Sequence, residues 1–538
     1  MRTSLPWYPR ELPPYQAGLY TGMTDSIAPA ASRNDRARVL LNAYVPPGPP
    51  GTPVVGRPGF TYRGLTGDAA MGSGAAVGQA IFFWKTTAGV GHLNAIVDGI
   101  IYEYDFATSL WASVVTQANI TSASCILSVS ARIRTASYQG VIIISDGINV
   151  PFTWDGTAGA GGIVEGTNVP VTYGEPVNHY AKAFVIKGTE RDTFAWSEEA
   201  AFNTGYEAGG YNNSWTPLGA GPFYALAATN EALYAFRSRG ILSITGRVND
   251  EFQTTGTRSS VSESEGTLSP VKVTDAGIFF VNADGQPHYF QPGGQPIPLW
   301  EDCKETIKNV VKTALPSAAI LEYTPMSAVL IGLPELGQTN PSMWLVYRID
   351  KQSGTIPDLV GVFTGFLSAD SCIAENASGA PVWFHLGIAD GFAYEHGAPD
   401  GQVWDDVYPT ATLAIIHEVQ GHPWGPSMVA EKTWDRVDIV LSLPEPITAD
   451  SSYVTPRGTS TPISVGFEGA GGTLYNTKAY DTFFYADDSL IESRQTVGIS
   501  GHGRWLQPIL RHSALGERFS FTSWEAVALL TTRDRTVK

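Results

Sequence analysis

Two histidines five positions apart are the first residues whose spacing could serve chemistry. They lie in the stretch His417-Glu418-Val419-Gln420-Gly421-His422. A zinc-protease helix needs its histidines at i and i+4, so that both rings lie on one face. An offset of five rotates the second ring by about 500° at roughly 100° per residue, so the rings diverge. Gly421 and Pro423 also oppose a helix here. The stretch therefore predicts no metal site.

Other catalytic patterns are incomplete or absent. The stretch Gly498-Ile499-Ser500-Gly501-His502 lacks the last glycine of a Gly-x-Ser-x-Gly elbow, and the sequence has no Gly-x-x-x-x-Gly-Lys-Ser/Thr loop. Adjacent carboxylates occur at Asp405-Asp406 and Asp487-Asp488. Glycosidase carboxylates meet only in the folded chain, so that chemistry stays open. We expect no enzyme, and we predict no catalytic residue, cofactor or metal.

Six aromatic residues within 29 positions fit two different roles. A carbohydrate-binding surface presents such rings, and so does packing between the sheets of a β-protein. We favour packing. The residues are Trp196, Tyr206, Tyr211, Trp215, Phe223 and Tyr224.

Four Asp-Gly pairs indicate the elements that must position any such residues. Each pair lies between short runs of β-forming residues, as in Val141-Ile142-Ile143-Ile144-Ser145 before Asp146-Gly147. A type I′ hairpin turn needs φ > 0 at both central residues, which favours Asp-Gly. The pairs are candidate contacts at an interface or a channel: Asp98, Gly99, Asp146, Gly147, Asp284, Gly285, Asp390 and Gly391.

The turn signals recur at a regular distance. Gly188, Asn230-Glu231 and Pro334 fill the gaps, so the marks at 98, 146, 188, 230, 284, 334 and 390 are 42 to 56 residues apart. A β-propeller blade takes roughly 40–50 residues. The spacing favours a propeller, and a large β-sandwich is the alternative.

Composition favours an all-β protein that assembles. The chain has 538 residues, 43% of them apolar, with 57 Gly and 36 Pro spread along it. This length predicts two or more domains. Charged residues are only 16%, and a surface poor in charge is often covered by neighbouring subunits.

The charge is negative and uneven. The net charge is −17, yet residues 1–62 carry six arginines against Glu11, Asp25 and Asp35, which gives +3 and leaves −20 for the remainder. Phosphate affinity comes from Lys and Arg, so an acidic body should not hold nucleic acid, although DNA could pass along it. Ordinary solubility explains the charge as well.

The sequence divides into three segments. Residues 1–62 are predicted to be an extended, Pro-rich arm, with Arg33, Arg36, Arg38 and Arg57 as candidate partner-binding residues. Residues 63–400 carry the hairpin series, interrupted by a helix near 301–315 whose apolar stripe includes Ile307, Val310, Val311 and Leu315. Residues 401–538 have longer strand candidates and predict a second β-domain, either a platform or the strands that close the propeller.

Cysteines and apolar runs give expectations about location. The three cysteines, Cys125, Cys303 and Cys372, are widely separated and predict neither a disulfide framework nor a metal site. The start lacks the apolar region of a signal peptide, and no run approaches the roughly 18 apolar residues of a membrane span. We expect assembly in a reducing cytoplasm.

The order of several short motifs resembles tail proteins of short-tailed phages, namely the tail hub, or packaged-DNA stabilisation, family and the related tail nozzle proteins. A stretch near the C-terminus, Phe483-Phe484-Tyr485-Ala486-Asp487-Asp488, also resembles these proteins. The other motifs are Leu40-Leu41-Asn42-Ala43-Tyr44, Gly56-Arg57-Pro58-Gly59-Phe60, Phe194-Ala195-Trp196-Ser197, Trp215-Thr216-Pro217, Leu233-Tyr234-Ala235-Phe236, and the segments 240–246, 269–274 and 277–281. The similarity covers most of the chain in element order and includes no catalytic residue. The chain departs from the family in its long Pro-rich segment before Leu40 and in its platform domain.

The resemblance implies a structural virion protein. A propeller protomer would form a ring, expected to be a homohexamer, below the portal and adaptor proteins. The ring would retain packaged double-stranded DNA and conduct it during ejection without sequence-specific binding, and tail fibres or tailspikes could dock on the platform. The expected location is the virion tail, after assembly in the host cytoplasm. The alternative is a carbohydrate-active β-propeller, either a glycosidase or a lectin, for which the aromatic cluster and turn carboxylates speak.

Overall fold

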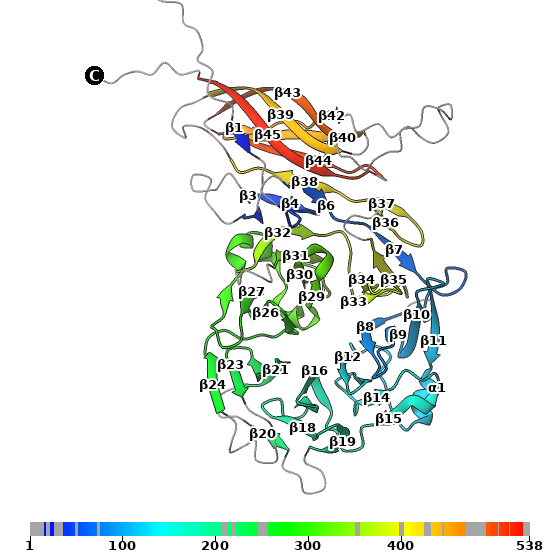
Figure 1. The fold of residues 1–538 in the computed structure, drawn as a ribbon. Coiled ribbons are helices and arrows are strands. Elements are labelled where there is room, and N and C mark those ends of the chain that lie inside the picture. The colour runs from blue at the N-terminus through cyan, green and yellow to red at the C-terminus, as the bar shows by residue number, and fades with distance from the viewer. Residues whose placement is uncertain are drawn as a thin grey trace, which may run out of the picture.

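Short antiparallel strands make up nearly all of the regular structure in the computed structural model of the chain (Figure 1). The prediction of an all-β propeller with an additional β-domain is confirmed. The structure describes residues 15–17, 22–25, 36–48, 52–72, 76–206, 213–216, 221–245, 257–349, 356–397, 403–423, 432–443, 446–467, 491–503, 505–515 and 517–530.

The propeller consists of consecutive four-stranded meanders, and six of its blades are sheets of their own. The first three comprise β8 (Gly78–Lys85), β9 (Gly91–Val97), β10 (Ile100–Asp105) and β11 (Leu110–Val115); β12 (Arg134–Tyr138), β13 (Val141–Ser145), β14 (Phe152–Trp154) and β15 (Ile163–Glu165); and β16 (Thr172–His179), β17 (Lys182–Lys187), β18 (Phe194–Glu198), β19 (Ala201–Gly205) and β20 (Ser214–Trp215).

The remaining blades follow in chain order. They comprise β21 (Phe223–Ala228), β22 (Ala232–Arg237), β23 (Ile241–Thr245) and β24 (Thr257–Ser262); β25 (Lys272–Thr274), β26 (Gly277–Val281), β27 (Pro287–Phe290) and β28 (Ile297–Pro298); β29 (Ala319–Tyr323), β30 (Ala328–Leu333), β31 (Met343–Arg348) and β32 (Asp358–Phe363); and β33 (Asp370–Glu375), β34 (Pro381–Leu386) and β35 (Ala393–His396). The meander β29–β32 occupies a seventh blade position and is continuous with the large sheet of the second domain.

The blades close into a ring around a central axis (Figure 1). The first strands β8, β12, β16, β21, β25, β29 and β33 contact one another in that order, and β33 returns to β8. The last blade takes its fourth strand from the N-terminal side, because β7 (Phe60–Arg63) pairs with β35 in the register Phe60↔His396 to Arg63↔Ala393. The chain thus closes the ring with a strand that lies far from β35 in the sequence.

Apolar side chains on both faces of a blade pack against the neighbouring blades. On β13, Ile142 and Ile144 pack in the cluster shared with the first blade, whereas Ile143 packs in the cluster shared with the third blade. Trp84 and Trp154 meet across the first two blades, with ring centroids 5.9 Å apart. Because successive strand residues face opposite sides, a blade buried on both faces needs a continuous apolar run. This explains why the second blade contains three consecutive isoleucines.

The seven turn marks fall one to each blade, which supports the spacing used to predict the propeller. Six of them link the second and third strands of a blade, whereas Asn230-Glu231 links β21 to β22. Only Asp98-Gly99 has φ > 0 at both residues, 51° and 69°, as a type I′ turn requires. In the other three pairs only the glycine has positive φ, so the predicted turn type is wrong there. Longer loops around those glycines replace the two-residue turn.

The second domain is a large curled sheet above the propeller (Figure 1); we call it the platform. Its strands are β38 (His417–Gln420), β39 (Lys432–Leu443), β40 (Ile447–Thr455), β41 (Gly458–Thr459), β42 (Ile463–Phe467), β43 (Ile491–Gly503), β44 (Gln507–His512) and β45 (Ser520–Leu530), joined by β1 (Tyr15–Ala17), β4 (Val39–Leu41), β5 (Ala43–Tyr44) and β6 (Val54–Gly56). Pairing of β32 with β4 and β5 makes one sixteen-stranded sheet that runs from the platform into the propeller.

The N-terminal residues that the structure describes are built into both domains. The expected boundary at 62 falls inside β7, and β4, β5 and β6 are platform strands. Beyond residue 400, β36 (Asp405–Val407) pairs with β7 and β37 (Thr412–Ala414) pairs with β36, so they extend the last blade. Two short strands, β2 (Gly22–Met23) and β3 (Arg36–Ala37), pair in parallel.

The predicted helix at 301–315 is wrong. The segment forms separate 3-10 turns at Trp300–Cys303, Thr306–Asn309 and Lys312–Ser317. Val310 is extended between them and bridges to Glu335. The adjacent β-branched Val310 and Val311 favour this extended backbone over a helix. Sequence reasoning also missed α1 (Gln117–Ser122), which begins at the capping box of Thr116 and Asn119. Short 3-10 turns also occur at Ala160–Gly162 and Thr324–Met326.

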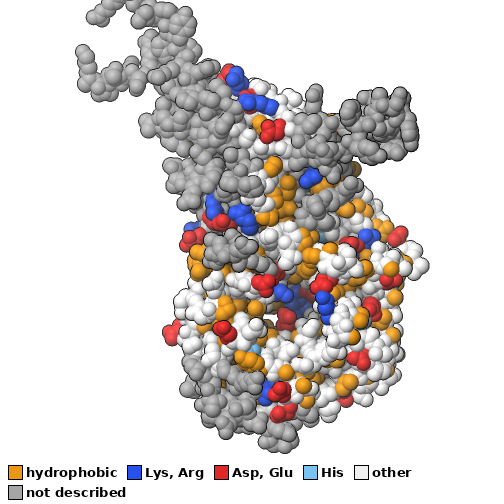
Figure 2. All heavy atoms as spheres, in the orientation of Figure 1, with side chains coloured by type: hydrophobic (Ala, Val, Ile, Leu, Met, Phe, Trp, Pro, Cys, Tyr) orange, Lys and Arg blue, Asp and Glu red, His pale blue; other side chains and the backbone are white. Residues whose placement is uncertain are grey.

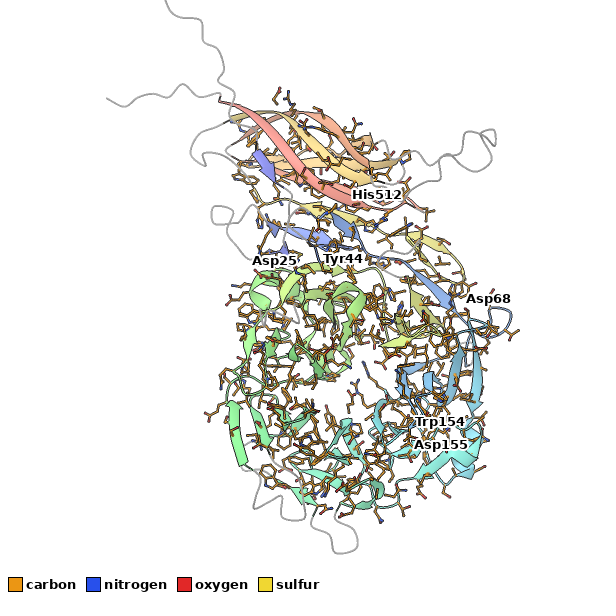
Figure 3. The ribbon with its side chains drawn as sticks, viewed as in Figure 1. Asp25, Tyr44, Asp68, Trp154, Asp155 and His512 are labelled. Atoms are coloured by element: carbon orange, nitrogen blue, oxygen red, sulfur yellow. The ribbon has the colours of Figure 1, made fainter. Side chains whose placement is uncertain are left out.

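A buried ion pair holds platform and propeller together. Arg57 donates to both carboxylate oxygens of Asp406, at 2.8 and 2.5 Å, and its Nε donates to Asn42 at 3.1 Å. The side chain of Arg57 is 1% exposed and that of Asp406 is 7% exposed. Tyr44 and Asp25 lie at the same boundary between the domains (Figure 3). The pair therefore ties the N-terminal segment to the extension of the last blade.

We expect Arg57→Met to destabilise the chain by about 3–5 kcal/mol, because it leaves the Asp406 carboxylate buried without its cation. Urea unfolding, followed by intrinsic tryptophan fluorescence, measures the loss. Lys308→Ala is the matched control, since Lys308 pairs with Glu305 at the surface and should leave the midpoint unchanged. An Arg57→Met midpoint equal to the wild-type value would contradict the role of the pair.

Candidate functional site

The four Asp-Gly tips lie on one face of the propeller, together with the connections between blades. In each case the pair links the second and third strands of its blade. Asp98 Oδ1 accepts a hydrogen bond from the Val77 amide at 2.8 Å, and Asp146 Oδ2 accepts one from the Ser128 amide at 2.8 Å. Asp284 forms a 2.7 Å ion pair with Lys312. These three carboxylates thus fasten chain segments that lead into first strands, whereas Asp390 accepts hydrogen bonds from Phe392 and Tyr394 of its own hairpin.

The glycines of these pairs lie close to the same connections. A Cβ added to Gly391 would lie 2.2 Å from the Met71 carbonyl oxygen, and one added to Gly285 would meet Val310 at 3.0 Å. Both glycines have positive φ. The tips therefore have a role within the chain, and contact with a partner or a channel stays a prediction.

Three of the four candidate arm arginines, Arg36, Arg38 and Arg57, are occupied by contacts within the chain. Arg57 is buried in the ion pair described above. Arg36 bridges Asp302 and Asp358 at 2.9 Å each, and Arg38 donates to Gln507 at 3.3 Å. Arg33 lies outside the described residues. Arg57 is thus not available to a partner, because its side chain is buried and bonded to Asp406.

The centre of the propeller holds a hollow lined by charged side chains. Figure 2 shows basic and acidic side chains gathered around it. Two cavities of about 640 and 660 Å³ share Arg132, Arg134 and Glu175 as lining residues. We call this feature the tunnel. Sequence reasoning missed all three residues, because no motif surrounds them. The sequence feature that could have identified them is a charged residue on, or just before, the first strand of a blade.

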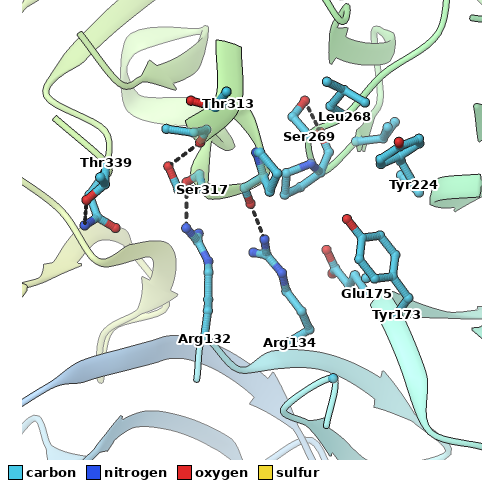
Figure 4. A pocket seen from close by; sticks show the side chains of 18 of the residues that line it. Arg132, Arg134, Tyr173, Glu175, Tyr224, Leu268, Ser269, Thr313, Ser317 and Thr339 are labelled. Carbon is cyan, nitrogen blue, oxygen red and sulfur yellow. Dashed lines mark hydrogen bonds between the residues drawn. The ribbon is translucent and has the colours of Figure 1, made fainter. Parts of the chain in front are cut away.

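Arg132 and Arg134 reach across the tunnel to the other wall (Figure 4). Arg132 donates to the Ser317 carbonyl at 2.7 Å and to Asp370 at 3.2 Å. Arg134 donates to the Pro316 carbonyl. Burial lowers the pKa of Arg132, and its neighbour Arg134 lowers it further, while Asp370 opposes both. The two guanidinium groups therefore link the second blade to the segment before β29.

Glu175 faces the same tunnel from β16. The Glu175 side chain is exposed to the tunnel, and the protein that surrounds it raises the pKa of its carboxyl, while Lys272 and Arg134 act to lower that pKa. Tyr173 and Tyr224 line the tunnel beside it. Their rings hold the Arg191 guanidinium, whose central carbon lies 3.6 Å from the Tyr173 centroid and 4.5 Å from the Tyr224 centroid. The tunnel thus combines a free carboxyl, guanidinium groups and aromatic rings.

Most of the aromatic cluster packs inside the propeller, as we expected. Trp196, Tyr206 and Phe223 are buried, and Trp215 packs edge-on against Phe194 at 5.4 Å. Tyr224 differs because it also lines the tunnel. Tyr211 lies outside the described residues.

The histidines of the opening motif are structural. His417 lies on β38 rather than on a helix, and it is buried with its Nδ1 donating to the Asn42 carbonyl at 2.7 Å. His422 is also buried. In the part of the chain that the structure describes, no group of three or more His, Cys, Asp or Glu could hold a metal ion. No helix of that part is long and apolar enough to span a bilayer.

Comparisons with known proteins give little beyond this geometry. No family model matches, and no curated protein matches. The extracellular domain of the one component system BT4673 from B. thetaiotaomicron shares 11% identity at a TM-score of 0.37, covering 63% of this chain and 40% of that one. PorZ of Porphyromonas gingivalis shares 9% at a TM-score of 0.37, covering 69% and 44%. The exo-beta-1,3-galactanase of Phanerochaete chrysosporium shares 9% at a TM-score of 0.26, covering 88% and 100%. The chain thus spans less than half the length of the first two. Similarities this low give no information on function.

The buried histidines predict sensitivity to acid. Burial lowers the pKa of His385 and His417 to about 3 and that of His179 and His422 to about 4. Imidazoles in the unfolded chain have a pKa of about 6.5. As the pH falls below that value, the unfolded chain therefore binds more protons than the folded chain, and the folded state loses stability relative to it. The melting temperature should therefore fall steadily from about pH 6.5 to about pH 4.

Calorimetry across this range measures the effect. His179→Phe should make the decline shallower, because it removes one of the groups and His179 Nε2 has no hydrogen-bond partner among the described residues. A melting temperature that is constant down to about pH 4.5 would contradict the assignment of buried neutral imidazoles.

Proposed function

We propose that the chain is a structural protein of a phage tail, in which copies form a ring that continues the DNA channel below the portal and adaptor. The resemblance of the sequence to tail hub and nozzle proteins motivates the proposal. A propeller held to a platform by a continuous sheet supports it, since such a ring must carry load without separating. The net charge of −17 supports it too, because DNA passes an acidic wall without adhering.

One surface carries the proposal of assembly. The hairpin of β36 and β37 ends in an open edge, since β37 pairs only with β36 among the described strands. Leu413 on this edge is 52% exposed, and Ile416, three residues later, is 49% exposed. Leu515 is 58% exposed and follows β44, which pairs with β38 in the register His417↔His512. Open edges and clustered apolar side chains mark surfaces that another chain covers. We call Leu413, Ile416 and Leu515 the waist patch, because they lie where the platform meets the propeller.

The DNA channel would run between copies rather than through the propeller of each. The two tunnel cavities of about 640 and 660 Å³ have the size of small-molecule pockets. Arg132 and Arg134 cross that space to bond with the opposite wall. The ring would therefore enclose its bore with the outer surfaces of its propellers or platforms.

Leu413→Lys combined with Ile416→Lys should weaken assembly, because two charges would replace apolar side chains at the covered edge. Native mass spectrometry of the recombinant protein and of tail complexes measures it. We expect a sixfold mass for the wild type and at least a tenfold higher concentration for half-assembly in the variant, or about 1.4 kcal/mol or more. Val90→Lys is the control, since Val90 is 55% exposed on a turn of the first blade. A wild-type chain that remains a monomer in tail complexes would rule out the ring.

A carbohydrate-active propeller is a second candidate, because the tunnel holds a carboxyl of raised pKa, Glu175, and a carboxylate bonded to an arginine, Asp370. Two carboxyl groups in different environments are the arrangement of glycosidases.

Glu175→Gln should then reduce glycan hydrolysis by about 10²–10⁴-fold, as expected for loss of a general acid. A glycan array followed by hydrolysis assays on its hits measures binding and cleavage. Asp68→Asn, an exposed carboxylate at the rim of the first blade (Figure 3), is the control. An absence of binding to any glycan would remove this candidate.

A further inference from the structure

A third cavity opens between the last two blades, apart from the tunnel. Its volume is about 540 Å³. Tyr408, which directly follows β36, forms part of its wall. We call it the blade cavity. Its lining includes Glu335, Phe366, Leu367, Asp390, Tyr394 and Tyr408.

The blade cavity is negatively charged. Glu335 accepts a hydrogen bond from the Ser342 hydroxyl at 3.1 Å, and Asp390 accepts one from the Phe392 amide at 3.0 Å and one from the Tyr394 hydroxyl at 2.5 Å. Neither carboxylate forms an ion pair with a described residue, and no Lys or Arg lines the cavity. Arg57 packs against the ring of Phe366, which lines the cavity, and its charge is neutralised by Asp406. The cavity therefore favours a cation.

Aromatic rings and exposed leucines surround the two carboxylates. Tyr394 and Tyr408 lie with centroids 5.5 Å apart, and Phe366 lies 4.9 Å from His385. Burial lowers the pKa of His385 to about 3, so its ring is neutral here at physiological pH. Leu336, next to Glu335, is 80% exposed, and Leu367 is 39% exposed. A guanidinium on an apolar segment suits this surface, since it bonds carboxylates in a fork and stacks on rings.

The N-terminal residues of the chain have that chemistry. Residues 1–14 contain Arg2 and Arg10 among Leu5, Trp7, Tyr8 and Leu12, with four prolines. Proline-rich segments bind aromatic-lined grooves at low entropic cost, because they are already extended. Fourteen residues can span roughly 46–50 Å.

The described chain begins on the platform. Strand β6 pairs with β45 at Ser520 and Phe521, next to the propeller, whereas β1 pairs with it from Trp524 to Ala526. Because Ala17 opposes Trp524 and Tyr15 opposes Ala526, Tyr15 lies farther along β45 from the propeller than Ala17 does. Residues 1–14 are thus joined to the chain on the platform, whereas the blade cavity lies in the propeller.

We propose that the blade cavity binds an arginine from residues 1–14 of a second copy of this chain. The inference rests on the proposed ring, and it names the contact by which neighbouring copies hold each other. Arg10 enters between Glu335 and Asp390 over the tyrosine rings, and Trp7 or Leu12 covers the exposed Leu336 and Leu367.

Disulfide trapping in full-length chains tests the contact. One chain carries Glu11→Cys and the other carries Leu367→Cys, and the native Cys125, Cys303 and Cys372 are buried and should not react. Mild oxidation of the mixture should give a disulfide-linked dimer. Arg10→Ala in the first chain, or Glu335→Gln with Asp390→Asn in the second, should lower the yield at least fivefold. Asp68→Asn is the matched control and should leave it unchanged.

Two results would overturn the proposal. One is a dimer yield that is the same with Glu335→Gln and Asp390→Asn, in protein whose melting temperature is unchanged. The other comes from a chain that carries both Glu11→Cys and Leu367→Cys: a disulfide that forms within this single chain, while the mixed single-cysteine chains give no dimer. Native mass of the same samples separates this failure from failure of the ring. A sixfold mass without trapping overturns the arm contact alone, whereas a monomer without trapping overturns both.

Discussion

Ring closure by β7 is the constraint on which the rest of the structure depends. A propeller is stable only when its last blade packs against its first, and here the last blade is complete only when residues near position 60 pair with β35. That pairing fixes Phe60 among the aromatic rings of the last blade, including His385, Tyr394 and Tyr408. It also brings Arg57 to Asp406. The segment 57–63 therefore both closes the propeller and joins it to the platform.

The same closure explains why the platform and the propeller share a sheet. After β6 the chain has only a few residues before β7, so the strands on either side must lie at the domain boundary. β4 and β5 reach β32 from the platform side, and β36 reaches β7 from the propeller side. A protein built in this way transmits a force on its platform to the propeller through hydrogen-bonded strands.

The sequence predicted the repeat well because turn chemistry is local. Asp98-Gly99 and its counterparts mark one blade each, since a hairpin needs its turn residues wherever the rest of the chain lies. Pairing at a distance was not predictable in the same way. The predicted helix at 301–315 failed because Val310 bridges to Glu335, and the predicted arm up to 62 missed strands whose partners lie hundreds of residues away. Arg132, Arg134 and Glu175 meet only because the inner strands of separate blades converge on one axis.

Cryo-electron microscopy of tail complexes purified from particles would show whether copies of the chain form a ring. We expect a closed ring of six copies around a continuous bore, with each propeller closed by its own β7. A solitary subunit, or a ring without a continuous bore, would contradict it.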